Sequence, residues 1–145
     1  MENKEKNKVY ISLMTKLNKA LKNEFYYEAI FIEYAILEDR TESILKHSNV
    51  YIENPTLSKK LSTIKRLKTL DNKYCKKHLN NELIQSIYTW KKDRNCLIHD
   101  LIVSEYNNVN VKKIAEEGYL IVKKLNNKST LVNKYIDSII KEKNK

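Results

Sequence analysis

The sequence predicts an all-α fold, an up-and-down bundle of four to five helices in a single domain over residues 1–145. A single Gly and a single Pro leave few tight turns and few helix breakers. Apolar side chains recur at three- and four-residue spacing along most of the chain. The length suits one domain, which would bury roughly two thirds of the surface of its unfolded chain.

The first half of the chain is expected to contain three helices. Residues 5–22 carry a thin apolar stripe, which predicts a weakly packed N-terminal helix. Residues 23–46 include the most apolar run, from Phe25 to Leu37, so this helix should be the central element of the bundle. Pro55 marks the break before a third helix, which should end near Leu67.

The second half is expected to contain a connection and two helices. The polar stretch at residues 71–77 predicts the connection, and residues 81–93 predict a fourth helix with Trp90 facing inward. Asn107 and Asn108 predict a break before the final helix, which should end near residue 141. Gly118 and the pair Asn126–Asn127 are the points where that last helix could be interrupted.

The net charge of +10 is unevenly distributed along the chain. Residues 24–53 carry seven acids against two bases, whereas residues 56–79 carry eight bases against one acid. A basic C-terminal tail, residues 123–145, carries seven bases against two acids. This asymmetry suggests a basic face for a polyanion and an acidic face for another partner. For the tail, the solvated surface of a lysine-rich protein explains the charge equally well.

The composition indicates a cytoplasmic protein with no membrane contact. No apolar run approaches the length of a membrane span. The first eight residues are charged and lack the apolar core of a signal peptide.

Two Cys-x-x-His pairs, Cys75 with His78 and Cys96 with His99, raise the question of a zinc site. Neither pair has the Gly or Pro turn that is common in zinc knuckles, and a small buried apolar side chain is the simpler role for Cys96. The chain also lacks a Gly-rich phosphate loop, a Gly-x-Ser-x-Gly motif and a cluster of carboxylates. We therefore expect no metal and no cofactor.

The most informative stretch runs from Arg94 through Asn95 to His99. Arg stays cationic at physiological pH and forks onto phosphate oxygens, while His can accept or donate a proton near neutrality. Cleavage of an RNA phosphodiester needs both abilities. On an ideal helix a five-residue step rotates about 140°, so the two side chains would point to different sides. Either the helix unwinds between them, or two copies of the motif meet across a twofold axis.

The spacing of an Arg, a polar residue and a His, with four residues between Arg94 and His99, resembles the HEPN superfamily. The resemblance implies a helical bundle that dimerises so that both motifs line one cleft, and a metal-independent endoribonuclease. It also implies a toxin or antiviral defence role, with an antitoxin or another defence protein as a partner. Leu101 stands where one toxin branch has a Tyr that its antitoxin modifies, which does not favour regulation by that route.

In the ribonuclease hypothesis, His99 is the general acid or base and Arg94 binds the scissile phosphate. Asn95 could orient a phosphate oxygen or the imidazole. Glu33, with Arg40 seven residues later on the same face, could pair with Arg94 in a supporting role, although an ordinary ion pair within or between helices explains Glu33 slightly better. The basic side chains assigned to RNA binding are Lys91, Lys92, Lys65 and Arg66.

Each motif residue also has a structural interpretation. His99 could cap a helix, and Arg94 could pair with Asp93, with Asp100 or with an acid on the long helix. Two other functions therefore stay open. One is a non-catalytic HEPN-like module for binding or assembly, and the other is a basic nucleic-acid-binding bundle in which the motif is accidental. Some of the ten tyrosines could stack on bases, although most are expected to pack with their hydroxyls at the surface.

Overall fold

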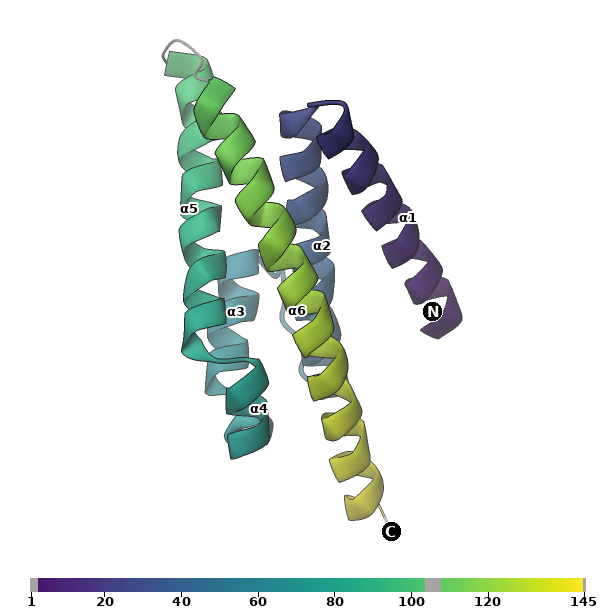
Figure 1. Cartoon of the computed structure of the whole chain (residues 1–145). Coiled ribbons are helices and arrows are strands. Elements are labelled where there is room, and N and C mark those ends of the chain that lie inside the picture. The colour runs from purple at the N-terminus through teal and green to yellow at the C-terminus, as the bar shows by residue number, and fades with distance from the viewer. Residues whose placement is uncertain (1–2, 104–107, 145) are drawn as a thin grey trace. The chain divides into compact units, whose positions relative to one another are not determined.

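The computed structural model describes residues 3–103 and 108–144. For residues 3, 4, 6, 100–103, 108 and 109 it describes the backbone but not the side chains. The described residues form six α-helices and one short 3-10 helix, with no strand among them (Figure 1). The prediction of an all-α fold is confirmed for this part of the chain, but the expected number of four to five helices is too low. The elements are α1 (Asn3–Lys22), α2 (Tyr26–His47), α3 (Leu57–Arg66), η1 (Lys68–Leu70), α4 (Lys73–His78), α5 (Asn81–Val103) and α6 (Asn108–Lys143).

The chain divides into two compact units, each assembled from two separate stretches of sequence. Unit 1 combines Met1–Ile36 with Thr89–Leu120, and unit 2 combines Leu37–Tyr88 with Ile121–Lys145. The three long helices α2, α5 and α6 contribute residues to both units. That the whole chain behaves as one domain stays a prediction.

The core of unit 1 is centred on Trp90 of α5, which is 1% exposed. Its indole N–H donates a hydrogen bond to the Ile114 carbonyl oxygen at 2.9 Å, and its ring stacks on Tyr34 with centroids 6.5 Å apart. Helix α1 contributes Leu17 and Ala20, both buried, near its end. Earlier in α1, Val9 and Ile11 are exposed and Leu13 and Met14 are half-buried, so the fully buried side chains of this helix lie in its second half.

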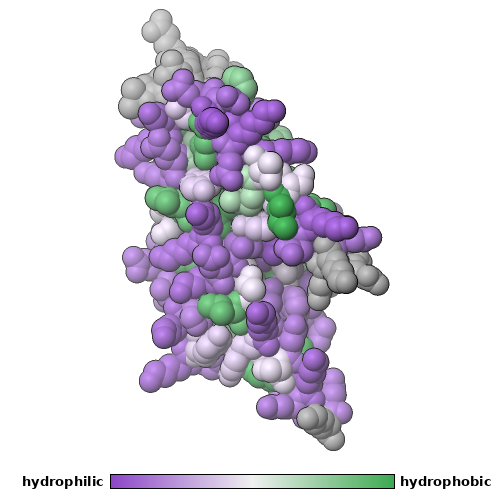
Figure 2. Space-filling view, turned by 45° about the vertical axis from the view of Figure 1, so that its right-hand side comes forward, coloured by the Kyte–Doolittle hydropathy of each residue, from purple (hydrophilic) through white to green (hydrophobic). Residues whose placement is uncertain are grey.

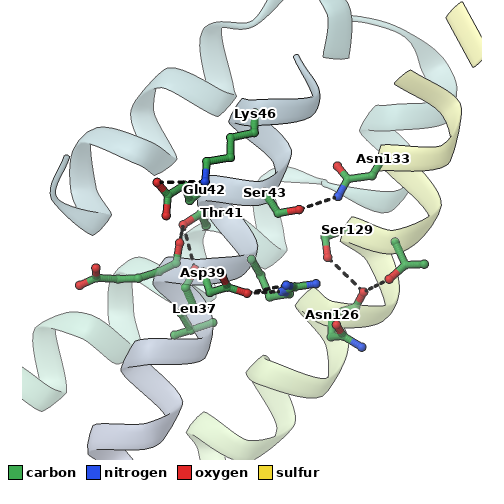
Figure 3. Close-up of polar contacts among 12 residues, drawn as sticks. Leu37, Asp39, Thr41, Glu42, Ser43, Lys46, Asn126, Ser129 and Asn133 are labelled. Carbon is green, nitrogen blue, oxygen red and sulfur yellow. Dashed lines mark hydrogen bonds and ion pairs between the residues drawn. The ribbon is translucent and has the colours of Figure 1, made fainter. Parts of the chain in front are cut away.

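The core of unit 2 is an apolar cluster with a polar edge. Ile44, Ile64 and Ile136 are among the buried side chains of the cluster. Beside it, Asn133 on α6 donates from Nδ2 to Ser43 Oγ on α2 at 3.2 Å (Figure 3). Since both polar residues are buried, this hydrogen bond satisfies groups that would otherwise destabilise the core.

Three expectations about the helices were wrong. Residues 71–77 are not simply a connection, because Asn72 Oδ1 accepts from the Cys75 backbone N–H at 2.9 Å and starts the short helix α4. Helix α5 continues ten residues beyond residue 93, as the apolar periodicity of Leu97 and Ile98 allows. Helix α6 passes through Gly118 and through Asn126 without interruption. Of the expected break at Asn107 and Asn108, residue 107 lies outside the described residues and Asn108 starts α6.

Candidate active site

The motif lies in unit 1, on the second half of α5. The helix is continuous from Arg94 to His99, so the five-residue step places the two side chains about 140° apart around its axis. Of the two routes to a common site, local unwinding is therefore excluded in this structure. A single copy presents Arg94 and His99 on different sides of one helix.

Arg94 is half-buried and held in place by neighbours in unit 1. Its guanidinium carbon lies 4.0 Å from the centre of the Tyr34 ring on α2, a distance typical of a cation–π contact. Its NH1 group donates to Asn95 Oδ1 at 3.0 Å, while its Nε is buried and has no hydrogen-bond partner among the described residues. The guanidinium is thus positioned by a ring face and an amide, and it forms no ion pair with a carboxylate of the described residues, Asp93 included.

Asn95 connects Arg94 to the exposed side of the helix. Lys92, Asn95 and His99 are all exposed, and steps of three and four residues place them on one side of α5, which we call the motif face. Because Asn95 accepts the hydrogen bond from Arg94, one edge of the guanidinium is fixed beside this face, one helical turn from His99. Lys91, also expected to bind RNA, is half-buried on the neighbouring side.

Glu33 takes neither of the roles expected for it. Its side chain is 0% exposed, and both carboxyl oxygens lack a hydrogen-bond partner among the described residues, so it pairs neither with Arg94 nor with Arg40. Burial raises its pKa to about 9, which means that the carboxyl is protonated at neutral pH. Arg40, which belongs to unit 2, pairs with the neighbouring Asp39. Both expectations fail because Glu33 faces the core at Gly118 and Trp90.

A pocket of about 280 Å³ opens between α5 and α6 in unit 1. It borders the motif through Cys96, whose thiol is exposed, but Arg94, Asn95 and His99 do not line it. The lining residues are Asp93, Cys96, Leu97, Asn110, Lys113, Ile114 and Glu117. With two carboxylates, a lysine and an amide beside apolar side chains, the pocket has the polarity to accept a small polar group beside the motif face.

The residues expected to bind RNA are divided between the units. Lys91 and Lys92 belong to unit 1, whereas Lys65 and Arg66 belong to unit 2, at the end of α3, where both are exposed. Arg66 donates from Nε to the Ser62 carbonyl oxygen at 3.2 Å, a bond that its position in the last turn of the helix favours. The structure does not place these two pairs in one site.

The two Cys-x-x-His pairs belong to different units. Cys75 is buried in unit 2, whereas Cys96 is exposed in unit 1, so the buried role expected for Cys96 is wrong. Over residues 3–103 and 108–144, no group of three or more His, Cys, Asp or Glu side chains could hold a metal ion. In the same ranges no helix combines the length and apolar character that a membrane span requires. The side chain of Leu101 lies outside the described residues.

Sequence reasoning overlooked the two neighbours that shape this region, Tyr34 beneath Arg94 and Gly118 against Glu33. A signal for Gly118 was present, because an isolated glycine within a helical pattern often marks close packing. Tyr34 had no comparable signal, because nothing in the sequence distinguishes it from the other nine tyrosines. No protein-family model, curated protein or solved structure matches this chain.

Proposed function

We propose that the chain is a metal-independent endoribonuclease of HEPN type that acts as a homodimer. The observation that carries the proposal is the fixed guanidinium of Arg94, held by Tyr34 and Asn95 at the edge of the exposed motif face. A preorganised cation and an exposed imidazole are the two groups that phosphodiester cleavage requires, and a dimer would bring them together. A toxin or antiviral defence role, with an antitoxin or defence partner in a cytoplasmic setting, extends the proposal through the resemblance alone.

The geometry of α5 supports the proposed homodimer. Because Arg94 and His99 diverge on one helix, the Arg94 of one copy would serve the His99 of the other. Exposed apolar side chains lie beside the motif: Ile98 is one turn after Arg94 on α5 and 42% exposed, and Phe31 is one turn before Tyr34 on α2 and 74% exposed. An apolar surface around a half-buried Arg suits a contact between two copies of the same chain.

The proposed reaction uses only groups of the protein, the RNA and water. His99 takes the proton of a ribose 2′-hydroxyl, and the 2′-oxygen forms a bond to the adjacent phosphorus. The bond from phosphorus to the 5′-oxygen then breaks, leaving a 2′,3′-cyclic phosphate and a 5′-hydroxyl that takes up a proton from the second His99 or from water. Arg94 stabilises the additional negative charge on the phosphoryl oxygens in the transition state. DNA lacks the 2′-hydroxyl and would resist cleavage.

One observation favours a second candidate, a basic bundle that binds nucleic acid without cutting it. Unit 2 contains 17 Lys and Arg against 8 Asp and Glu, a net charge of +9. Unit 1, which carries the motif, contains 11 against 10, a net charge of +1. Most of the excess positive charge therefore belongs to the unit without the motif. This distribution is expected if the protein binds nucleic acid through that unit and does not cut it.

Cleavage of RNA in the presence of excess chelator distinguishes the two candidates. In the proposed enzyme, purified protein yields fragments with cyclic phosphate ends, and His99→Ala lowers the rate by about a hundredfold or more. Arg94→Ala should lower it by a similar factor. His47→Ala is the matched control, since His47 contacts Asp137 in unit 2 and lies outside the motif. Intact RNA with the wild-type protein, or equal rates for His99→Ala and wild type, would refute the nuclease.

The mass of the protein in solution tests the dimer. Light scattering should give twice the 17.2 kDa of the chain, and Phe31→Asp combined with Ile98→Asp should convert the protein to monomers and abolish cleavage. Leu131→Asp, at an exposed apolar residue of unit 2, is the control that should leave the dimer intact. A wild-type monomer that cleaves RNA would contradict the shared site.

A further inference from the structure

A stack of aromatic rings in unit 2 leads from the core to the surface. Tyr135 on α6 is half-buried and packs against the apolar cluster of this unit. Tyr74 on α4 stacks on Tyr135, with ring centroids 4.8 Å apart and planes 25° apart, and is itself 39% exposed. His78 meets the Tyr74 ring edge-on at 4.6 Å. An exposed ring thus rests on a platform that the core holds in place.

Positive charge surrounds this stack. Lys128 on α6 places its Nζ 3.5 Å from His78 Nδ1, and Lys77 lies beside His78 on α4, where it is exposed. Burial, then Lys128 and then Lys77 lower the pKa of His78, since two neighbouring cations oppose a third charge. We call Tyr74, Lys77, His78, Lys128 and Tyr135 the aromatic patch. Its unit carries the net charge of +9 described above.

We propose that the aromatic patch binds a single strand of RNA, with an unpaired base stacked on Tyr74 and the adjacent phosphate held by Lys128 and Lys77. Aromatic rings beside a basic groove are the usual means of holding an unpaired strand, because every base offers a face for stacking and every nucleotide a phosphate. The inference deepens the proposed function and rests on it for the identity of the strand as RNA. It adds a substrate-holding surface in unit 2, whereas the cleavage motif belongs to unit 1.

The chemistry of the patch favours an unpaired strand over other polyanions. A duplex hides the faces of its bases, so the exposed Tyr74 ring would contribute little to binding it. An acidic protein or an anionic lipid surface would use Lys77 and Lys128 but has no flat ring to place on Tyr74. A contribution of the Tyr74 ring to affinity therefore distinguishes an unpaired strand from a duplex, an acidic protein or an anionic lipid surface.

Binding of a short, unstructured, fluorescently labelled RNA to the full chain tests this proposal. The His99→Ala background prevents cleavage, so binding is measured whether or not the protein is a nuclease. Tyr74→Leu should weaken binding about fivefold or more, and Tyr74→Phe should retain it because stacking needs the ring and not the hydroxyl. Tyr51→Leu is the matched control, at a residue of the same unit that is 89% exposed and outside the patch. Circular dichroism checks that each variant is folded.

The titration of His78 gives a second readout that does not depend on a variant. A phosphate held by Lys128 and Lys77 offsets the two cations that oppose protonation of His78, so RNA should raise the pKa of this imidazole in an NMR titration. The ring of Tyr74 also faces this imidazole, and the ring of Tyr135 is stacked on Tyr74.

Several outcomes would overturn the proposal. These are an unchanged His78 pKa on addition of RNA, equal affinities for Tyr74→Leu and Tyr51→Leu, or equal weakening of single-stranded and duplex RNA by Tyr74→Leu. Failure of the proposed function looks different. If the protein binds RNA through Tyr74 but never cleaves it, the nuclease proposal is refuted and the aromatic patch proposal stands. If the protein cleaves RNA but Tyr74→Leu binds as tightly as wild type, the aromatic patch proposal is refuted and the nuclease proposal stands.

Discussion

The only glycine of the chain lies where α6 passes the buried carboxyl of Glu33. A Cβ at Gly118 would overlap Glu33 Oε1 and lie 2.7 Å from Trp90 Nε1, which is already fixed by its hydrogen bond to Ile114. Alanine would ordinarily stabilise a helix by about 1 kcal/mol over glycine. Here the close contacts should dominate, since overpacking a core costs about 1–3 kcal/mol.

We therefore predict that Gly118→Ala lowers the free energy of unfolding, measured with urea. The same substitution should cost less in a Glu33→Ala background, where the carboxyl no longer occupies the space. Asn127→Ala, at an exposed residue of α6, is the control. A higher free energy of unfolding for Gly118→Ala would show that the core rearranges to accommodate the added methyl group.

Glu33 should make the stability of the protein depend on pH. Its pKa is about 9 in the folded state and near its ordinary value of 4.5 in the unfolded chain, so the stabilising effect of its proton is complete below pH 4.5. Between these values the unfolded state releases a proton that the folded state retains, and the free energy of unfolding falls by up to about 1.4 kcal/mol per pH unit. Above pH 9 both states are ionised and the contribution is lost.

Glu33→Gln should therefore remove this slope between pH 5 and pH 8, with the variant gaining stability relative to wild type as the pH rises. Urea unfolding at several pH values measures the difference between the two proteins, in which the contributions of other titrating groups cancel. Parallel curves for Glu33→Gln and wild type would mean that Glu33 is ionised in the fold.

Arg94→Lys separates the charge of Arg94 from its shape. Lys retains the positive charge but lacks the planar group that lies on Tyr34 and donates to Asn95. Under the proposed function, we predict that cleavage falls by about tenfold or more, with KM changed less than kcat because the lost contacts position the transition state. Full activity in Arg94→Lys would assign Arg94 to general attraction of RNA.

At the scale of elements, the helices that carry the site follow from periodicity, whereas their ends depend on local contacts. The spacing of apolar residues predicted α1, α2 and α3 to within a few residues. It failed at α4, because a polar segment with an Asn cap and one buried cysteine resembles a loop in sequence. It also failed for Glu33, since a carboxyl facing a glycine on another helix leaves no pattern within its own helix.

The cap of α4 gives a prediction at this scale. Asn72 Oδ1 accepts from the Cys75 N–H, and Asn72 Nδ2 donates to the Thr69 carbonyl oxygen at 3.1 Å. Asn72→Ala should therefore destabilise the protein by about 1 kcal/mol, whereas Asn72→Asp, which can still cap, should cost less. Thermal unfolding measures both variants. Equal losses for the two substitutions would indicate that the bond to Thr69 is the more important one.

At the scale of the whole molecule, the two units differ in charge while the chain as a whole shows only +10. We predict that replacing Lys65, Arg66 and Lys68 of unit 2 with Gln weakens binding of single-stranded RNA and reduces its salt dependence by about two in the log–log slope. The matched replacement of Lys16, Lys19 and Lys22, exposed lysines of unit 1, should change the slope little. Equal slopes for the two triple variants would show that RNA does not distinguish the units.

On the face shown in Figure 2, hydrophilic side chains predominate and hydrophobic ones form small separate groups. The sequence revealed the charge asymmetry as blocks along the chain. It could not assign the blocks to units, because each unit combines two distant segments. Contacts between residues far apart in the chain, such as Tyr74 with Tyr135, were hidden for the same reason.

The unbroken course of α5 has a consequence for how much protein a cell would need before the proposed reaction begins. An enzyme whose site forms only in the dimer is inactive while its concentration is low. Its activity then grows with the square of the monomer concentration until most of the protein is dimeric. The expression level alone would thus set a threshold for activity, and a low basal level of expression would not cause cleavage of the RNA of the cell.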